Sequence, residues 1–256
     1  MTGAVLARDE ARNIAACLES LAWTDALLVI VDGRTTDDTS AIAERRGASV
    51  IHRRFRDYAS QRNAALDAVK TDWVFFLDAD ERVPADLAAE MRALVDAPVP
   101  GIGGYWAPRH NIIWGRRIDH GGWYPDYQLR LLRVAGARYD ESREVHELVS
   151  VEGETGHLLD PLVHYNYSTV REFLDKQEQY STLEARSRLR RGERVRPHQL
   201  LRRPQREFFR RYFELEGRLD GLHGLMLCGL LAWYELVTLV KLIALRRREI
   251  GSTAGG

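Results

Sequence analysis

Two carboxylates that end an apolar run are the residues of this chain whose types and spacing best suit chemistry. Residues 73–77 are all apolar, and Asp78 and Asp80 follow directly. A run of this kind predicts a strand buried on both faces of a parallel sheet. Because residues i and i+2 of an extended chain project to the same side, Asp78 and Asp80 can converge on one ligand. Two hard oxygen ligands at a strand end suit Mg²⁺ or Mn²⁺ carrying a diphosphate, although such acids can also do no more than begin a turn.

The elements around these acids alternate between strand and helix. We expect strands at residues 4–7, 26–31, 49–52 and 73–77, with helices at about 13–21, around 42–43, at 59–69 and from 84 to 95. This alternation predicts a parallel sheet with right-handed crossovers. The glycine-rich phosphate loops of dinucleotide enzymes and P-loop ATPases are missing from the sequence, which disfavours both classes. What remains is Asp32 after the second strand and the paired acids after the fourth.

The composition fits one large α/β domain with an appendage. The 256 residues include 37 basic and 37 acidic ones, so the net charge of +0 gives no sign of a nucleic-acid partner. Cys17 and Cys228 are far apart, which argues against a disulfide framework or a structural zinc site and favours a reducing compartment. The chain begins almost at once with a strand and without the pattern of a signal peptide, so we expect a cytoplasmic protein.

Four segments in order resemble the motifs of family 2 glycosyltransferases, and most closely the bacterial branch that includes lipopolysaccharide core β-glucosyltransferases. The segments are residues 9–14 (DEARNI), 31–39 (VDGRTTDDT), 62–66 (RNAAL) and 77–82 (LDADER). The resemblance implies the GT-A fold, a Rossmann-like, mostly parallel sheet flanked by helices, over residues 1–168. A C-terminal helical appendage would occupy residues 169–250. Arg34 departs from the family, which usually has small residues there, and it could alter donor contacts or reach a phosphate.

The resemblance implies a role for each polar position. The donor-binding residues would be Asp9, Glu10, Asp32, Arg62, Asn63 and Asp78. Within this set Asp32 would contact the nucleotide base and Asp78 the ribose, while Asp80 would hold the metal of a D-x-D motif. A divalent cation suits the reaction independently, because it neutralises the charge that grows on a departing nucleoside diphosphate without a proton transfer. For Arg62, a solvated arginine on a helix is the alternative.

Asp126 is predicted to be the catalytic base. It follows Pro125 in a loop rich in glycine and aromatic residues, a setting in which catalytic residues are common. An inverting transferase needs a base to take the proton of the acceptor hydroxyl, and the family has an acid at this position. Desolvation among aromatic rings could raise the proton affinity of the carboxylate. A loop acid that caps a turn is the alternative, and Glu147 is the rival for the base.

Two histidines stand near family motifs. In several GT-A enzymes a histidine in the region of residues 143–147 completes the metal site, and neutral imidazole suits Mn²⁺ beside carboxylates. The resemblance therefore makes His146 a candidate ligand, with a buried core histidine as the alternative. Residues 164–167 (HYNY) also match a family motif and are expected to be structural or to lie near the acceptor.

The C-terminal third is rich in arginine from residue 186 to 211 and apolar from 222 to 245. The arginines form either a solvated face or a surface that attracts anionic lipid headgroups. A spanning helix needs about 20 apolar residues, and Glu235 or Lys241 at its centre would cost roughly 2.5–3.5 kcal/mol. We therefore expect an interfacial helix that docks on a membrane in preference to a span. A helix packed on the catalytic domain or on a dimer partner is the third arrangement.

The sequence thus predicts a metal-dependent inverting glycosyltransferase that uses a nucleotide-sugar, with UDP as the expected nucleotide. The acceptor would be a lipid-linked or cell-envelope glycan. The protein would lie at the inner face of the cell membrane, on the cytoplasmic side, and a homodimer remains open. A sugar nucleotidyltransferase is the rival enzyme, but it usually has an early triphosphate loop that this sequence lacks. A non-catalytic membrane-associated scaffold is the third class, and the co-occurrence of all these acids argues against it.

Overall fold

The computed structural model describes residues 1–141 and 148–253, and the chain divides into two compact units. Unit 1 comprises Met1–His110 and Asp126–Tyr165, and unit 2 comprises Asn111–Pro125 together with the chain from Asn166 onward. The chain passes from unit 1 to unit 2 for the last time between Tyr165 and Asn166, close to the predicted domain boundary at residue 168. Unit 2 additionally takes residues 111–125, which the sequence had assigned to the catalytic domain.

Unit 1 is built on a seven-stranded sheet with the order β12-β6-β9-β4-β1-β2-β3. Its strands are β1 (Thr2–Ala7), β2 (Ala26–Asp32), β3 (Ser49–Arg53), β4 (Trp73–Asp78), β6 (Ile102–Ala107), β9 (Gln128–Arg133) and β12 (Glu154–His157). The four strands expected from the sequence form its parallel part, because β1 pairs parallel with β2 and β4, and β2 pairs parallel with β3. β9 runs antiparallel to both β4 and β6.

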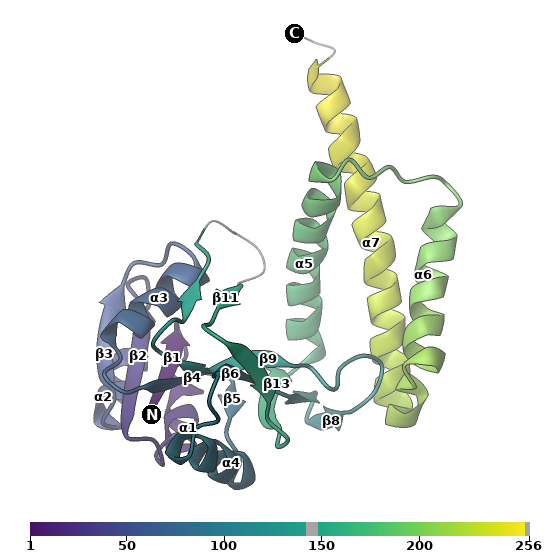
Figure 1. Ribbon diagram of the computed structural model, residues 1–256. Helices are drawn as coiled ribbons and strands as arrows, with labels where there is room; N and C mark the ends of the chain where they lie inside the picture. Colours follow the sequence, from purple (N-terminus) through teal and green to yellow (C-terminus); the bar gives the residue numbers. More distant parts are fainter. Residues whose placement is uncertain (142–147, 254–256) are drawn as a thin grey trace. The chain divides into compact units, whose positions relative to one another are not determined.

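Helices cover both faces of this sheet, as Figure 1 shows with α3 above it and α1 and α4 below it. The helices are α1 (Ile14–Glu19), α2 (Thr39–Arg45), α3 (Tyr58–Ala68) and α4 (Ala85–Asp96). Phe75 packs into the apolar cluster that contains α1, α2 and α4 residues, and Phe76 packs into the cluster on the α3 side. Neither ring is exposed, so β4 is buried on both faces as predicted. The predicted α/β architecture, a mostly parallel central sheet flanked by helices with a C-terminal helical appendage, is confirmed.

Short strands complete unit 1 next to the paired acids. β5 (Glu81–Arg82) follows the end of β4 and pairs antiparallel with β13 (Leu162–Tyr167), so that His164 lies opposite Glu81. β10 (Arg138–Tyr139) pairs with β11 (Val149–Ser150) beside α3. The pairing of β5 with β13 brings a segment from eighty residues further along the chain to the end of β4.

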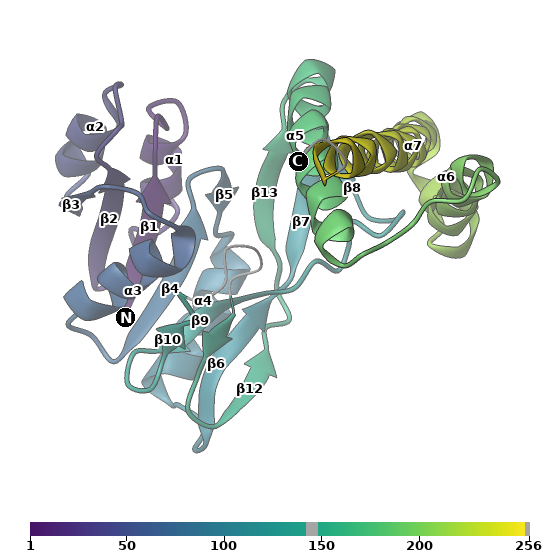
Figure 2. The same ribbon diagram turned by 90° about the horizontal axis from the view of Figure 1, so that it is seen from above.

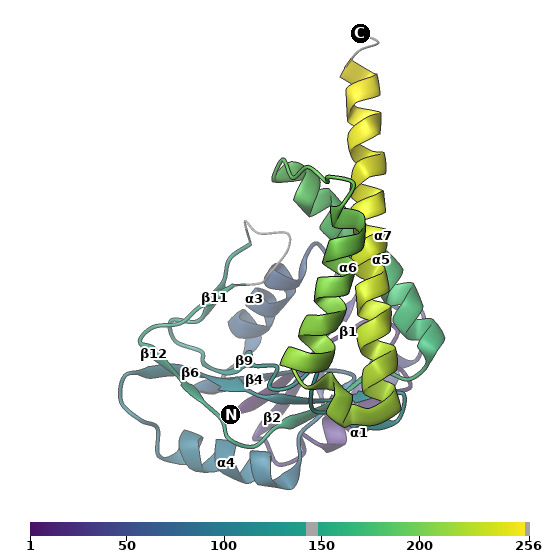
Figure 3. The same ribbon diagram turned by 90° about the vertical axis from the view of Figure 1, so that its right-hand side faces the viewer.

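Unit 2 is a helical bundle that carries one short hairpin. The hairpin consists of the end of β7 (Arg109–Ile113) and β8 (Arg116–Ile118). The helices are α5 (Val170–Arg190), α6 (Gln199–Phe209), the π-helical turn η1 (Arg210–Glu214), the 3₁₀ turn η2 (Gly217–Asp220) and α7 (Gly221–Thr253). α7 packs along both α5 and α6, and the two perpendicular views in Figures 2 and 3 show these three helices together. Ile113, Phe173 and Leu227 are fully or almost fully buried in the core of this unit.

The charged residues of α7 explain its position. Glu235 accepts two 2.8 Å hydrogen bonds from the guanidinium of Arg188 on α5. Lys241 donates to the hydroxyl oxygens of Ser181 and Thr182 on the same helix, at 2.9 and 2.8 Å. By length and composition alone, residues Gly217–Glu249 could cross a membrane. Both charges of α7 are thus satisfied by α5 within the appendage, a packing that the sequence analysis, with its helix on the catalytic domain or on a dimer partner, did not include.

Candidate active site

The two carboxylates at the end of β4 have different surroundings. Asp78 accepts hydrogen bonds from both terminal nitrogens of Arg130 and lies 3.4 Å from a guanidinium nitrogen of Arg62. Burial alone would raise the pKa of Asp78, but the charges of Arg130 and Arg62 outweigh it and hold that pKa well below its usual range. Asp80 instead lies beside His164, with Nε2 of the imidazole 3.4 Å from Oδ2.

The pair formed by Asp80 and His164 depends on the contact between β5 and β13. The backbone N–H of Tyr165 donates to the carbonyl oxygen of Asp80 at 2.9 Å, which fixes the neighbouring imidazole beside the carboxylate. Within residues 1–141 and 148–253, no cluster of three or more His, Cys, Asp or Glu side chains suits a metal ion. His146 and Glu147, the predicted ligand and the rival base, lie outside the described residues. The described part of the site therefore offers one carboxylate and one imidazole.

Glu81 is a buried centre of charge that the sequence analysis did not foresee. Its side chain is fully buried. Oε2 accepts the backbone N–H of Asp78 at 2.9 Å, and Oε1 accepts from Arg130 at 2.9 Å and from Arg109 at 3.1 Å. Because a buried carboxylate requires such partners, Glu81 holds both arginines and the end of β4 in one arrangement.

Asp126, the predicted base, belongs to the same network. Nε of Arg109 donates to Oδ2 of Asp126 at 3.0 Å, and the amide of Gln128 donates to Oδ1 at 3.2 Å. The sequence predicted a carboxylate desolvated among aromatic rings, whereas the structure gives Asp126 an ion pair with Arg109 and a side chain that is 32% exposed. A chain of contacts thus runs from Asp126 through Arg109 to Glu81.

Asp32, at the end of β2, is buried and bound to the one residue that departs from the family pattern. Arg34 donates to it from Nε at 3.0 Å, from Nη2 at 2.6 Å and from its backbone N–H at 3.0 Å. The hydrogen bonds of Arg34 outweigh the effect of burial and lower the pKa of Asp32 to about 2. The same guanidinium lies 5.3 Å from the centre of the Phe55 ring. Arg34 therefore covers the carboxylate that was expected to contact the base.

Asp9 and Glu10 connect the loops that follow β1 and β2. Oδ1 of Asp9 accepts the backbone N–H of Thr36 at 2.8 Å. The backbone N–H of Glu10 donates to the hydroxyl of Thr39 at 2.8 Å, and its carboxylate accepts from Asn13. The predicted donor residues Asp9 and Glu10 thus lie at the carboxyl edge of the parallel strands, where ligands of such sheets bind.

Arg62 and Asn63, adjacent on α3, have different partners. The guanidinium of Arg62 is held 5.2 Å from the centre of the Phe76 ring and 5.6 Å from that of Tyr139, and the residue is only 8% exposed. The alternative of a solvated Arg62 is therefore wrong. The amide of Asn63 exchanges hydrogen bonds with the backbone of Tyr139 at 2.9 and 3.0 Å and donates to Glu141. Asn63 thus ties α3 to β10 and has few groups left for a nucleotide.

Three charged residues of this site were missed by sequence reasoning: Glu81, Arg109 and Arg130. Arg130 had a visible signal, because it is a single arginine between two leucines and a buried arginine needs a carboxylate partner. Glu81 directly follows the D-x-D residues and could have been predicted as the carboxylate partner of a buried arginine. Arg109 gave no such signal. His164 belongs to the motif at residues 164–167 that was expected to be structural or near the acceptor, but its position beside Asp80 was not predicted.

Sequence comparisons find glycosyltransferases among the relatives of this chain. The family described as Glycosyl transferase family 2 matches residues 4–142. The lipopolysaccharide core biosynthesis glycosyltransferase LpsC of Rhizobium meliloti (strain 1021) is 31% identical over 245 residues, which cover 91% of this chain and 85% of that protein. An uncharacterized glycosyltransferase of Rickettsia felis (strain ATCC VR-1525 / URRWXCal2) is 22% identical over 249 residues, or 93% of this chain and 87% of that protein.

Two solved structures give weaker matches. TarS of S. aureus matches with a TM-score of 0.45 and 16% identity, over 72% of this chain and 39% of that one. Glucosyl-3-phosphoglycerate synthase of Mycobacterium tuberculosis matches with a TM-score of 0.37 and 23% identity, over 42% of this chain and 43% of that one. The chain spans less than half of either structure. The family match over more than half of the chain, together with the full-length likeness to LpsC, shows that this chain belongs to glycosyltransferase family 2.

Proposed function

We propose that this protein transfers a sugar from a UDP-sugar to a lipid-linked or cell-envelope glycan, with inversion at the anomeric carbon. The observation that carries the proposal is the difference between the two acids at the end of β4. Asp78 is held by Arg130 and Arg62, whereas Asp80 lies beside His164. We therefore assign the organic contacts of the donor to the first acid and the cation to the second.

The donor set of Asp80 and His164 fits a divalent metal. A carboxylate oxygen and an imidazole nitrogen 3.4 Å apart match the ligand preferences of Mn²⁺, and the carboxylate also suits Mg²⁺. When bound there, the cation would neutralise negative charge on the departing diphosphate. Asp78 does not fit as a ligand, because Arg130 and Arg62 already occupy its oxygens.

The chain's own residues would perform the remaining work. We assign nucleotide recognition to the loops after β1 and β2, where Asp32 is covered by Arg34. We assign the ribose and diphosphate to the region of Asp78, where the arginines supply positive charge. Asp126, oriented by Arg109, would accept the proton of the acceptor hydroxyl. That oxygen would form the new bond to the anomeric carbon as the bond to the diphosphate breaks, and the diphosphate would leave with the electron pair.

The name of the Rhizobium relative supports the acceptor class. That protein is described as a glycosyltransferase of lipopolysaccharide core biosynthesis, and its likeness extends over nearly all of this chain. We therefore propose a lipopolysaccharide core precursor as the acceptor and the cytoplasmic face of the membrane as the location. The opposing hypotheses, a nucleotidyltransferase and a non-catalytic scaffold, gain no support from the contacts in the site.

The test is a calorimetric titration of UDP into the protein with and without Mn²⁺, repeated on Asp80→Asn and on Asp86→Asn. Asp86 is an exposed carboxylate on α4, so its variant is the matched control. We expect binding that depends on Mn²⁺, that is lost in Asp80→Asn and that is unchanged in Asp86→Asn. A panel of UDP-sugars would then identify the sugar. If UDP fails to bind under any condition, the UDP assignment is wrong and other nucleotides must be tested.

A further inference from the structure

One face of α6 and η1 combines exposed apolar side chains with arginines. We define this α6 outer face as Leu201, Arg202, Gln205, Arg206, Phe209 and Phe213. Leu201, Phe209 and Phe213 are 65%, 57% and 46% exposed. Positions 201, 205, 209 and 213 recur at intervals of four, and residues at this spacing lie on one side of a helix. The apolar residues therefore form a stripe along the helix and are not scattered.

The aromatic rings in this region stack along the helix. Phe209 stacks on Phe213 with ring centres 5.2 Å apart, and Phe208 stacks on Tyr212 at the same separation. Tyr212 also contacts Phe213 edge to face at 5.1 Å. Contiguous exposed apolar surface of this kind marks a site of interaction with a protein or a membrane. The neighbouring charges decide between these two partners.

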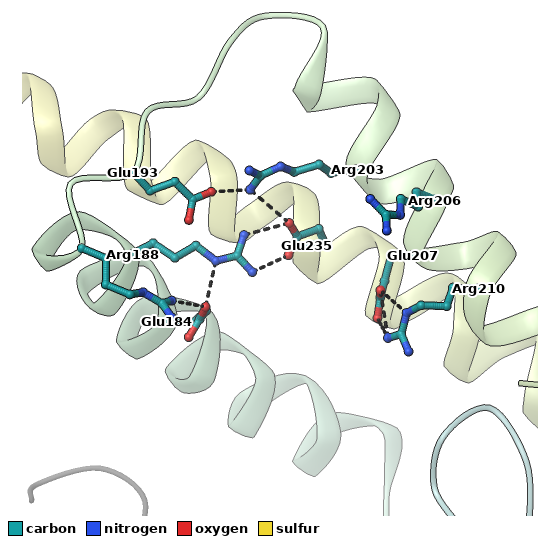
Figure 4. Close-up of a pocket in the computed structure, with 9 residues that line it drawn as sticks. Glu184, Arg188, Glu193, Arg203, Arg206, Glu207, Arg210 and Glu235 are labelled. Atoms are coloured by element: carbon teal, nitrogen blue, oxygen red, sulfur yellow. Dashed lines mark hydrogen bonds and ion pairs between the residues drawn. The ribbon is translucent and has the colours of Figure 1, made fainter.

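Some arginines of unit 2 form ion pairs with glutamates, and others have no such partner among the described residues. Figure 4 shows a groove of about 800 Å³ between α5 and α6 that is lined by arginine and glutamate. Within it Arg188 pairs with Glu235 at 2.8 Å, and Arg210 pairs with Glu207 at 2.8 Å. The first pair joins α5 to α7, and the second lies within the continuous turn of α6 and η1, so we assign the groove a structural role.

Arg202 and Arg206 lie outside this pattern of ion pairs, although Arg206 also lines the groove. Neither makes an ion pair or a side-chain hydrogen bond with any residue of the described part of the chain, and both are exposed. Figure 4 shows the Arg206 side chain without a partner. Glu207, the one carboxylate within α6, is engaged by Arg210 and Arg211. The α6 outer face therefore has two uncompensated positive charges beside its aromatic stripe.

We propose that the α6 outer face docks on the surface of a lipid bilayer with anionic headgroups. Aromatic rings would enter the boundary between headgroups and acyl chains, and Arg202 and Arg206 would contact lipid phosphates, as in interfacial amphipathic helices. A second copy of the chain fits this face less well. A two-fold contact apposes identical surfaces, so the unpaired arginines of both copies would be brought together without a carboxylate between them.

The proposal differs from the sequence prediction, which gave the docking role to residues 222–245. α7 does expose Leu222, Met226, Trp233 and Val240, which recur at helical spacing. Its exposed arginines, Arg247 and Arg248, lie beyond the C-terminal end of this apolar stripe, whereas Arg202 and Arg206 lie among the apolar residues of the α6 outer face. The inference deepens the membrane location given under the proposed function and rests on it for its biological meaning. Vesicle binding is measured without donor or acceptor, so the two proposals can fail separately.

The test is flotation of the full chain with vesicles of phosphatidylcholine alone and of phosphatidylcholine mixed with an equal amount of phosphatidylglycerol. We expect binding to the mixed vesicles only. Each arginine removed should weaken this binding about fivefold, so Arg202→Gln/Arg206→Gln should weaken it about 25-fold. Phe209→Ser/Phe213→Ser should weaken it about tenfold or more, because two rings no longer leave water. Thermal unfolding followed by circular dichroism verifies that both variants fold.

Two control variants decide which surface is responsible. Arg45→Gln removes an exposed arginine from α2, and Trp233→Ser removes the large exposed ring of α7 that is 58% exposed. Both should bind mixed vesicles like the unmodified protein. The proposal is overturned by equal binding to neutral and anionic vesicles, by absence of binding to either, or by folded α6 variants that bind normally. Loss of binding in Trp233→Ser with normal binding in Phe209→Ser/Phe213→Ser would assign docking to α7 instead.

Discussion

The guanidinium of Arg109 contacts two carboxylates at once. Its Nη1 lies 3.1 Å from Oε1 of the buried Glu81, and its Nε lies 3.0 Å from Oδ2 of Asp126. Glu81 also binds Arg130, which holds Asp78. The proposed base and the proposed ribose contact are therefore connected through one buried carboxylate, and a change at Glu81 should affect both.

Glu81→Gln should lower the free energy of unfolding by about 3 kcal/mol, because removing one charge from a buried network leaves its partners uncompensated. Glu44→Gln, which changes an exposed residue of α2, is the control and should have little effect. The measurement is urea denaturation of both variants and of the unmodified chain. Equal stability of Glu81→Gln and Glu44→Gln would show that Glu81 does not hold the site together.

Asp126→Asn should reduce the turnover number by a factor of about 10² to 10⁴, the usual contribution of a general base. Nucleotide binding should remain, because the amide oxygen can still accept from Arg109. The measurement combines transfer rates with calorimetric titration of UDP. Turnover close to that of the unmodified enzyme would show that Asp126 is not the base. Glu147 would then be the candidate base, which Glu147→Gln tests.

Arg34→Ala should change how stability depends on acidic pH. The pKa of Asp32 is about 2 in the folded chain, below its ordinary value of 3.8, so the folded state holds this carboxylate charged where the unfolded state protonates it. The resulting stability is fully present above pH 4 and is lost as the pH falls from about 4 to 2. Unfolding free energies at pH 5 and pH 3 should therefore differ less in Arg34→Ala than in the unmodified chain. The matched variant Arg45→Ala should keep the original difference.

His164→Asn should weaken Mn²⁺ binding about tenfold or more and leave metal-free nucleotide binding unchanged, because an imidazole ligand beside Asp80 is removed. His52→Asn changes an exposed histidine on β3 and should have no effect. The affinity is read from titrations of Mn²⁺ into the protein in the presence of saturating UDP. Identical Mn²⁺ affinities for the two variants would remove His164 from the proposed metal site.

Local patterns in the sequence determined the parallel half of the sheet. β1, β2, β3 and β4 and the helices between them follow from short apolar runs and helical spacing, which depend on neighbouring residues alone. The positions of Asp32, Asp78 and Asp80 at strand ends follow in the same way. The order of the four family motifs was sufficient to identify the family.

Tertiary structure alone decided what surrounds these acids. Because β9 pairs antiparallel with β4, Arg130 can donate hydrogen bonds to Asp78. Because β13 pairs with β5, His164 lies beside Asp80. The packing of α7 on α5 likewise pairs Glu235 with Arg188. Contacts between strands and helices depend on register and packing over long stretches of chain. Their partners therefore cannot be read from local periodicity, and the electrostatics of the site became visible only in the fold.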